Sequence, residues 1–499
     1  MNVLALRIHK RDNVAVAMLP LAQGQTIPIE GQSLAVITDV PKGHKIALGD
    51  LPAGAEVIKY GHPIGSTNGP VAKGTWVHGH NLRTNLADLA EYHFTPAPRE
   101  PVPRPVQPPC FQGYRRQNGR VGTRNEIWIL NTVGCINKSA ENIARLASER
   151  FRDKHCDGIF AFPHPYGCSQ LGDDLRNTQK LLAGLMQHPN AGGVLVLGLG
   201  CENNQLDDLL RLAPEMDPTR LRSLCAQSVP DEIEAGVQAV GELFARMTSD
   251  RREECSASDL VLGMKCGGSD AFSGITANPL VGRITDLVTA WPGRVILSEV
   301  PEMFGAEQLL MNRAQDEAVY AATVHMINRF KEYFLRHGQP IHENPSPGNK
   351  DGGITTLEEK SLGAIQKGGQ STITQVLDYG EPITARGLAL LNAPGNDGVS
   401  ATALTASGAT LLLFTTGRGT PFGFPVPTIK IATNTALATS KPNWIDFNAG
   451  QLTDGTAPIP ALTDQFLSYL LEVASGRIQT KNEQNGYREI AIWKDGVTL

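Results

Sequence analysis

The sequence predicts an α/β protein in which a small N-terminal β-rich domain is joined by a proline-rich linker to a two-part α/β region with mostly parallel sheets. Residues 1–94 alternate short apolar runs with glycine and proline turns, which is typical of short strands. Seven of the fifteen residues in 95–109 are proline, a composition that favours an extended polyproline II segment. After residue 113, strand, glycine-containing loop and amphipathic helix recur, as in parallel sheets covered by helices.

This pattern divides the chain into a β domain over 1–94, a linker over 95–112, an α/β domain over 113–345 and a C-terminal α/β domain over 346–499. The boundary near 345 rests on a stretch rich in Gly, Ser, Asn and Lys over 344–353. Short strands are expected at 3–8, 14–18 and 34–37. Beyond the linker, apolar periodicity predicts strands at 127–133, 158–162, 193–198, 260–264, 294–298, 388–391, 410–414 and 428–431, and helices at 140–151, 174–186, 231–247 and 308–335.

Length and composition indicate a globular enzyme. A chain of 499 residues exceeds the ~250–300 residues at which single cores stop growing. The formal charge of -5 argues against a broad nucleic-acid surface, and no apolar run approaches the ~18 residues of a membrane span. Eight cysteines without C-x-x-C pairs indicate reduced thiols rather than a disulfide framework. We therefore expect a cytoplasmic protein that binds a small molecule, neither nucleic acid nor membrane, with homo-oligomerisation left open.

Several predicted strands run directly into loops that place a cysteine close to glycine. These cysteines are Cys135, Cys168, Cys201 and Cys266, and Glu202 follows the third of them. In open α/β sheets, ligands bind outside the carboxyl ends of the strands, so these loops are expected to border a ligand site. Any one of these cysteines could instead be a small buried apolar residue. As a set, Cys168, Cys201 and Cys266 are candidates for metal binding or catalysis.

The N-terminal domain offers further groups that could bind a metal. His44 and Lys45 follow a Pro-Lys-Gly turn, and His78 and His80 are separated by one residue. On a strand, that spacing points both imidazoles to one face, which suits two neighbouring metal ligands. Two surface histidines would give the same pattern.

Arginine, lysine and amide side chains beside glycines could bind an anionic substrate. Arg124 precedes Asn125, Lys350 ends the segment 344–350, and Arg418 lies between two glycines. Arginine can bind a carboxylate through two hydrogen bonds, and glycine lets backbone N–H groups approach it. Neither the dinucleotide-binding glycine spacing nor a Walker A motif occurs, which disfavours a nucleotide cofactor.

Seven segments, taken together, resemble the altronate and galactarate dehydratase family over nearly the whole chain. They are 42–48, 166–168, 198–202, 266–270, 274–279, 344–350 and 416–421. Segments 77–81 and 300–307 are closest to the altronate branch. The resemblance implies an N-terminal SAF-type domain, a ferrous iron requirement, with Mn²⁺ as a second choice, and conversion of D-altronate to 2-dehydro-3-deoxy-D-gluconate and water in hexuronate catabolism.

Dehydration of a sugar acid removes a weakly acidic proton from C2, next to the carboxylate, so it needs a base, an acid and charge stabilisation. We expect His44 or His164 to act as base or acid and Lys45 to hold charge. The expected metal ligands are His78, His80, Cys168, Cys201, Glu202 and Cys266. The expected substrate-binding residues are Arg124, Asn125, Ser269, Asp270, Asn349, Lys350 and Arg418.

Other readings of the same residues stay open. Three cysteines can hold an iron–sulfur cluster in place of a single ferrous ion. Within the family, galactarate dehydratase and sulfolactate lyase are chemical alternatives. A sugar-acid-binding protein without catalysis is the non-enzymatic alternative, and a turnover assay separates it from the others.

Overall fold

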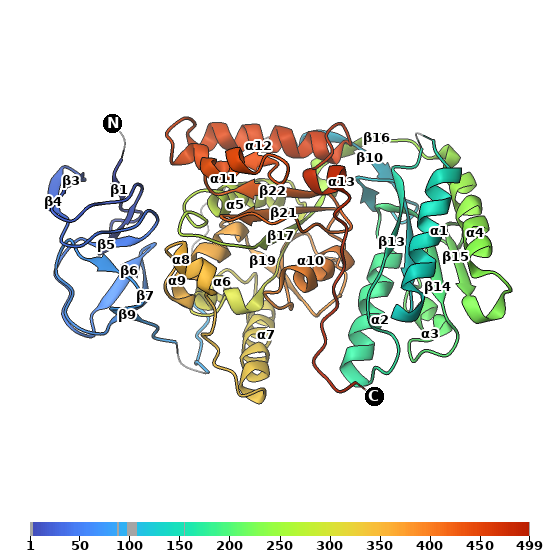
Figure 1. Cartoon of the computed structure of the whole chain (residues 1–499), viewed down its shortest axis with the longest axis horizontal. Helices are drawn as coiled ribbons and strands as arrows, with labels where there is room; N and C mark the ends of the chain where they lie inside the picture. Colours follow the sequence, from blue (N-terminus) through green and yellow to red (C-terminus); the bar gives the residue numbers. More distant parts are fainter. Residues whose placement is uncertain (1–2, 87–88, 97–106, 154, 499) are drawn as a thin grey trace.

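The computed structural model describes residues 3–86, 89–96, 107–153 and 155–498. Three parts lie in a row: the N-terminal β domain, a central seven-stranded sheet with its helices, and a four-stranded sheet with its helices (Figure 1). The expected class, a small β domain followed by an α/β region with parallel sheets, is confirmed. The predicted extended linker over 95–112 falls partly on 97–106, which lie outside the described residues.

The N-terminal domain is built from short antiparallel strands. In the hairpin of β3 and β4, Ile27 and Ile29 are buried while Thr26 and Pro28 are exposed, so the period of two places one face on the core. A four-stranded sheet has the order β1-β2-β5-β8, and a three-stranded sheet has the order β6-β7-β9. The strands are β1 Ala5–Leu6, β2 Val14–Ala17, β3 Thr26–Ile29, β4 Gln32–Ala35, β5 Lys45–Ala47, β6 Glu56–Lys59, β7 His62–Thr67, β8 Trp76–Val77 and β9 Leu82–Arg83.

The four-stranded sheet is parallel, with the order β13-β12-β14-β15. Ile127 and Ile129 of β12 pack with α1 and α4, whereas Trp128 and Leu130 pack with α2. This alternation explains why helices cover both faces. The elements are β12 Glu126–Asn131, α1 Asn137–Arg150, β13 Gly158–Phe162, α2 Gly172–Met186, β14 Ala191–Gly198, α3 Leu206–Arg211, β15 Leu221–Cys225 and α4 Glu232–Arg246.

The seven-stranded sheet is also parallel and has the order β19-β20-β18-β17-β21-β22-β23. It takes strands from both sides of residue 345, so the structure differs from the domain boundary expected there. The stretch 344–353 includes the short helix α8 Pro347–Asp351, and the loop before this helix borders a cavity. The strands are β17 Val261–Cys266, β18 Arg294–Leu297, β19 Ile373–Leu377, β20 Gly387–Leu391, β21 Leu411–Thr416, β22 Thr428–Ala432 and β23 Phe447–Asn448.

The chain passes from one parallel sheet to the other through a small antiparallel sheet with the order β11-β10-β16. Its strands are β10 Cys110–Arg115, β11 Val121–Gly122 and β16 Glu253–Ser256. Helices α2 and α10 (Asp397–Ala406) pack on each other and join the two α/β parts. The change of sheet therefore lies between β15 and β17.

The remaining helices cover the central sheet. The single helix expected over 308–335 is two helices, because Asp316 caps a new one through a hydrogen bond from the Val319 N–H. None of the helices in the described ranges is long and apolar enough to cross a membrane. These helices are α5 Ala277–Ala290, α6 Glu307–Met311, α7 Glu317–Arg336, α8 Pro347–Asp351, α9 Leu357–Ala364, α10 Asp397–Ala406, α11 Thr435–Ser440, α12 Ile459–Ala474 and α13 Lys481–Asn485.

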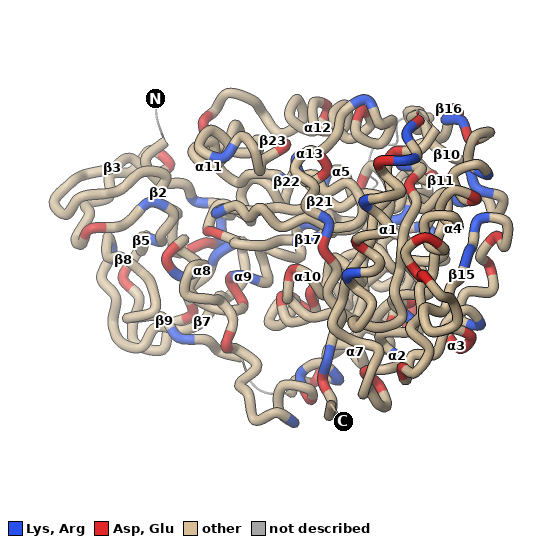
Figure 2. Tube along the Cα trace, turned by 45° about the vertical axis from the view of Figure 1, so that its right-hand side comes forward, with Lys and Arg blue, Asp and Glu red and all other residues tan. Residues whose placement is uncertain are grey.

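The N-terminal domain shares its core with the central part. Val14, Leu51 and Val57 belong to the same buried apolar cluster as residues of α5 and β17. The Thr356 hydroxyl donates to the Ile64 carbonyl at 2.6 Å, which ties β7 to the segment before α9. Acidic and basic positions gather around α8 and α9, on the side of the N-terminal domain (Figure 2).

Candidate active site

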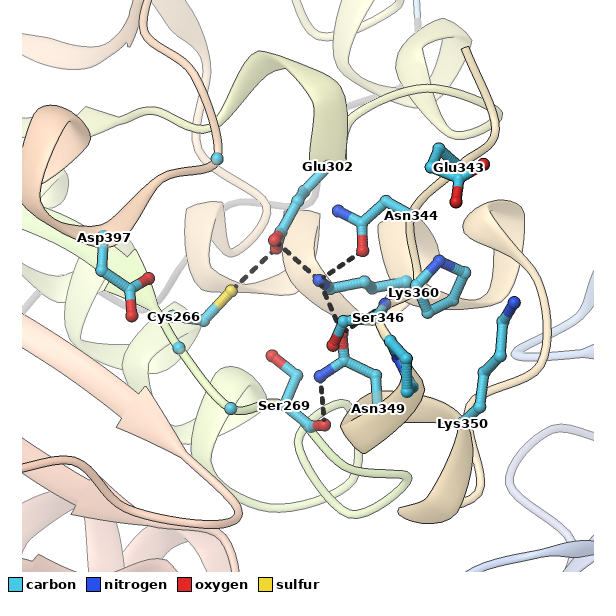
Figure 3. Close-up of a pocket in the computed structure, with 15 residues that line it drawn as sticks. Cys266, Ser269, Glu302, Glu343, Asn344, Ser346, Asn349, Lys350, Lys360 and Asp397 are labelled. Carbon is cyan, nitrogen blue, oxygen red and sulfur yellow. Dashed lines mark hydrogen bonds and ion pairs between the residues drawn. The ribbon is translucent and has the colours of Figure 1, made fainter. Parts of the chain in front are cut away.

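A cavity of about 560 Å³ lies where β17 ends, at the carboxyl edge of the central sheet. Its walls come from the loop after β17, a 3-10 turn at Val300–Glu302, the loop before α8, α9 and the loop before α10 (Figure 3). This is the edge at which open α/β sheets bind ligands. The lining residues are Cys266, Gly267, Gly268, Ser269, Glu302, Glu343, Asn344, Pro345, Ser346, Pro347, Asn349, Lys350, Lys360, Gly395 and Asp397.

One thiol and two carboxylates meet at the inner wall of the cavity. The strands β17 and β18 are parallel neighbours, so the residues that follow them come together. Cys266 Sγ lies 2.9 Å from Glu302 Oε2 and 3.6 Å from Glu299 Oε1. Glu299 has a φ of 71°, the left-handed conformation, which a side chain other than glycine rarely adopts. By donor type and spacing, these three residues are a candidate metal site.

Three lysines hold the same carboxylates. Lys265 binds Glu299 and also lies 2.9 Å from Asp397 Oδ1, and Lys367 Nζ is 3.0 Å from Glu299 Oε2. Lys360 Nζ is 2.9 Å from Glu302 Oε1 (Figure 3). A divalent cation at this point would lie among three ammonium groups, whose repulsion is large in a buried site. The residues present therefore do not fit a divalent ion, and they fit an ionised carboxylate beside a protonated thiol.

The pKa shifts agree with that reading. Burial, together with the charges of Glu299 and Glu302, raises the pKa of Cys266 to about 12. Burial alone would raise the pKa of Glu302, but Lys360, Lys265 and Lys367 hold it down to about 2. At neutral pH the Cys266 thiol therefore donates a hydrogen bond to an ionised Glu302.

The N-terminal domain borders a smaller adjoining cavity of about 210 Å³, which shares Pro345 and Lys350 with the larger one. His78 lines it, with Nδ1 2.8 Å from the Thr355 hydroxyl, and the His44 ring lies 4.7 Å from the His78 ring. Burial, with the charges of Lys45 and His44, lowers the pKa of His78 to about 4, so its imidazole is neutral at pH 7. His44 Nε2 is 3.3 Å from the Asp351 carbonyl.

A buried ion network fixes the N-terminal domain beside the cavity. Lys45 and Lys59 both lie 2.8 Å from the Glu359 carboxylate, and all three side chains are almost fully buried. Lys45 also donates to the Gly353 carbonyl and the Thr355 hydroxyl. Because Glu359 precedes Lys360 in α9, this network positions a lysine of the cavity.

We expect Glu359 to make stability depend on acid pH. Burial alone would raise its pKa, but Lys45 and Lys59 lower it to about 2, against 4.5 for the free side chain. A carboxyl group with a lowered folded pKa stabilises the protein fully above about pH 4.5, and this contribution is lost as the pH falls toward 2. Urea unfolding between pH 2 and 7 should show a free energy of unfolding that falls as the pH is lowered.

Glu359→Gln should flatten this dependence on pH. It should also lower the free energy of unfolding by about 3–5 kcal/mol at pH 7, because two buried lysines lose their partner. An unchanged slope would contradict the assignment.

Three of the expected substrate-binding residues line the main cavity: Ser269, Asn349 and Lys350. Asp270 lies behind them, and its carboxylate accepts hydrogen bonds from Thr433 at 3.0 Å and from other loop groups. Arg418 donates to the Gly348 carbonyl at 3.2 Å, at the base of α8. These contacts hold the loops that form the cavity.

Arg124 and Asn125 lie elsewhere, because they precede β12 and so stand at the amino edge of the other sheet. The Arg124 guanidinium is buried against Glu483, with an N–O distance of 2.6 Å. The Asn125 amide donates to the His155 carbonyl at 2.6 Å. Both side chains therefore have partners within the fold.

His164, Cys168, Cys201 and Glu202 lie at the carboxyl edge of the four-stranded sheet and do not line the cavity of Cys266. Both ring nitrogens of His164 face backbone groups, Nε2 at 2.7 Å from the Asn131 carbonyl and Nδ1 at 3.2 Å from the Tyr166 N–H. His80 is exposed beside Trp76. The structure thus brings His44, Lys45 and His78 together, but not the expected metal ligands as one set.

Sequence reasoning missed the carboxylates and lysines around Cys266. They are Glu299, Glu302, Lys265, Lys360 and Lys367. One signal was available: Lys265 lies in an apolar strand, and a lysine is almost never fully buried unless it is paired. The left-handed turn at Glu299 leaves no mark in the sequence.

Comparison with known proteins covers almost the whole chain. Residues 3–85 match the altronate/galactarate dehydratase SAF domain, 113–248 the D-galactarate dehydratase/altronate hydrolase second domain, and 257–498 the D-galactarate/altronate dehydratase C-terminal domain. The chain is 52% identical to an altronate dehydratase of Escherichia coli and 49% identical to one of Bacillus subtilis, each over 99% of both chains. It is 35% identical to a galactarate dehydratase (L-threo-forming) of Escherichia coli, over 98% of this chain and 96% of that one.

Proposed function

The chain belongs to the D-galactarate/altronate dehydratase family, and from this premise we propose that it is a hydro-lyase that converts D-altronate to 2-dehydro-3-deoxy-D-gluconate and water. The observation that carries the proposal is the chemistry of the main cavity, where Lys360 pairs with an ionised Glu302 beside a protonated Cys266 and Lys350 lines the same cavity. Ammonium groups suit a carboxylate substrate, and a carboxylate is a proton acceptor.

The substrate carboxylate would bind Lys350 and Lys360. The hydroxyl groups of the substrate would lie toward Ser269, Ser346 and Asn344. The two ammonium groups would also stabilise the negative charge that spreads onto the carboxylate when C2 loses its proton. Of these two groups, the Lys360 ammonium is held in a fixed position, because it donates to Asn344 Oδ1 at 2.9 Å and pairs with Glu302.

Glu302 is the general base in this proposal. In the free protein, Lys360 is one of the cations that keep Glu302 a weak base. When the substrate carboxylate engages Lys360, Glu302 loses part of that compensation and becomes a stronger base. The arrival of the substrate would thus activate the base that removes its C2 proton.

The bond between C3 and its hydroxyl oxygen then breaks, and the hydroxyl leaves as water with a proton from the Lys350 ammonium group, which lines the cavity. The resulting enol becomes the 2-keto acid by moving one proton to C3. His44 and Lys45 would be positioning residues. They do not border the main cavity, but His44 contacts His78 and Lys45 binds Glu359 of α9. No step is assigned to a metal held by Cys266, Glu299 and Glu302.

Turnover of sugar acids tests the proposal. We expect formation of 2-dehydro-3-deoxy-D-gluconate from D-altronate, with a kcat/KM at least tenfold above that for galactarate or sulfolactate. Preference for galactarate or sulfolactate would assign the chain to another activity of the family, and binding without turnover would make it a sugar-acid-binding protein.

The eight free cysteines favour a reducing compartment, so we place this activity in the cytoplasm. Its substrate, D-altronate, places it in hexuronate catabolism.

A further inference from the structure

We propose that Cys135, Cys168 and Cys201 hold an iron–sulfur cluster at the carboxyl edge of the four-stranded sheet. Each of these cysteines follows a different neighbouring strand: Cys135 follows β12, Cys168 follows β13 and Cys201 follows β14. Because the strands are parallel, the residues that follow them lie at the same edge of the sheet, so all three cysteines are brought to that edge.

The three cysteine loops are bonded to one another. The Gly134 N–H donates to the Tyr166 carbonyl at 2.8 Å, and the Asn204 N–H donates to the Gly167 carbonyl at 3.0 Å. The Ser169 N–H donates to Asn203 Oδ1 at 2.7 Å. Each bond joins residues within three positions of a cysteine, so the loops form one structural unit.

Two features of this unit point to a missing ligand. All three thiols are exposed, although free cysteine is among the most buried residue types. A buried donor of the same loops, Gln170 Nε2, has no hydrogen-bond partner within the described part of the chain. Buried polar atoms are nearly always paired, so this donor suggests a bound group that accepts a hydrogen bond, as a cluster sulfide does.

The spacing favours a cluster over a single ion. Thiolates around one tetrahedral ion, with bonds of about 2.3 Å, would lie roughly 4 Å apart. Among the described residues, the only three potential ligand atoms within 4.8 Å of one another are those of Cys266, Glu299 and Glu302. Cysteines that share a multi-iron cluster stand farther apart, and thiolates are the ligands that such clusters use.

Glu202 has a different part in this site. Burial would raise its pKa, but hydrogen bonds from Thr132 and from the N–H groups of Gly200 and Leu199 lower it. The N–H donors are 2.6 and 3.0 Å from the carboxylate. Glu202 is therefore a positioning residue that shapes the loop of Cys201.

Three cysteines leave one iron of a four-iron cluster free to bind an oxygen ligand. The cluster site stands on the loops alone, and its cysteines do not line the cavity of Cys266 in which the dehydration is proposed to occur.

Iron and sulfide analysis of the full-length chain, purified without oxygen and supplied with ferrous iron and sulfide, tests the site. We expect about four iron and four sulfide per chain with broad visible absorption. Cys135→Ser, Cys168→Ser and Cys201→Ser should each lower the iron content at least twofold. Cys110→Ser, which changes an exposed thiol on β10, is the matched control and should leave it unchanged. Unchanged iron in all three variants, or iron without sulfide, would overturn the proposal.

Alkylation of the unmutated protein gives a second measurement that does not depend on how the variants fold. With the cluster loaded, Cys135, Cys168 and Cys201 should be at least tenfold slower to react with iodoacetamide than after cluster removal, while Cys110 reacts equally in both. Equal labelling would overturn the proposal.

Discussion

Glu302→Gln should lower kcat for D-altronate by a factor of about 10²–10⁴, the range that general base catalysis usually contributes. The amide keeps the size of the side chain and can still accept the hydrogen bond from Cys266, but it cannot take a proton. KM should change much less, because Lys350 and Lys360 remain to bind the substrate carboxylate. Steady-state kinetics on purified variants measures both constants.

The matched control is Glu332→Gln, which removes an exposed carboxylate from α7, outside the lining of the cavity. It should leave kcat within about twofold of the unmutated protein, since surface changes away from the chemistry have small effects. The melting temperature of both variants shows whether the fold is intact. A folded Glu302→Gln protein that retains more than half of its activity would exclude Glu302 as the base.

Much of the fold could be predicted because periodicity reports local structure. The strand at 158–162 and the helix at 174–186 agree with the structure to within two residues, since both carry a clear apolar pattern. The division at 345 could not be placed correctly. A loop rich in Gly, Ser and Asn has the same composition whether it separates domains or borders a cavity within one sheet.

The candidate site was only partly predictable, for the same kind of reason. Cys266, Ser269 and Lys350 could be found because they follow a strand or lie in a glycine-rich loop. Glu302 and Lys360 are brought to Cys266 by the left-handed turn at Glu299 and by α9, contacts between distant parts of the sequence. Arg124 illustrates the converse, because a residue suited to bind an anion is instead paired with Glu483 inside the protein.

Removing the N-terminal domain should abolish turnover, with a loss of kcat/KM of at least about 10²-fold, the loss that a small misplacement of catalytic groups can cause. A chain that begins at residue 107 would lack Lys45 and Lys59, so the Glu359 carboxylate would lose both of its ion-pair partners. It would also expose the apolar surface that Val14 and Leu51 cover. Both changes strain α9, which carries Lys360 into the cavity.

Cleavage of the linker separates this effect from the loss of a covalent tether. A protease site introduced near residue 100 would leave both pieces present, and the buried Lys45–Glu359 and Lys59–Glu359 pairs together with the shared apolar core should hold them together. We expect the cut protein to keep at least half of its activity and to elute as one species in gel filtration. The chain from residue 107 alone should stay inactive until residues 1–94 are added. Full activity of the shortened chain by itself would show that the N-terminal domain neither positions α9 nor borders the working site.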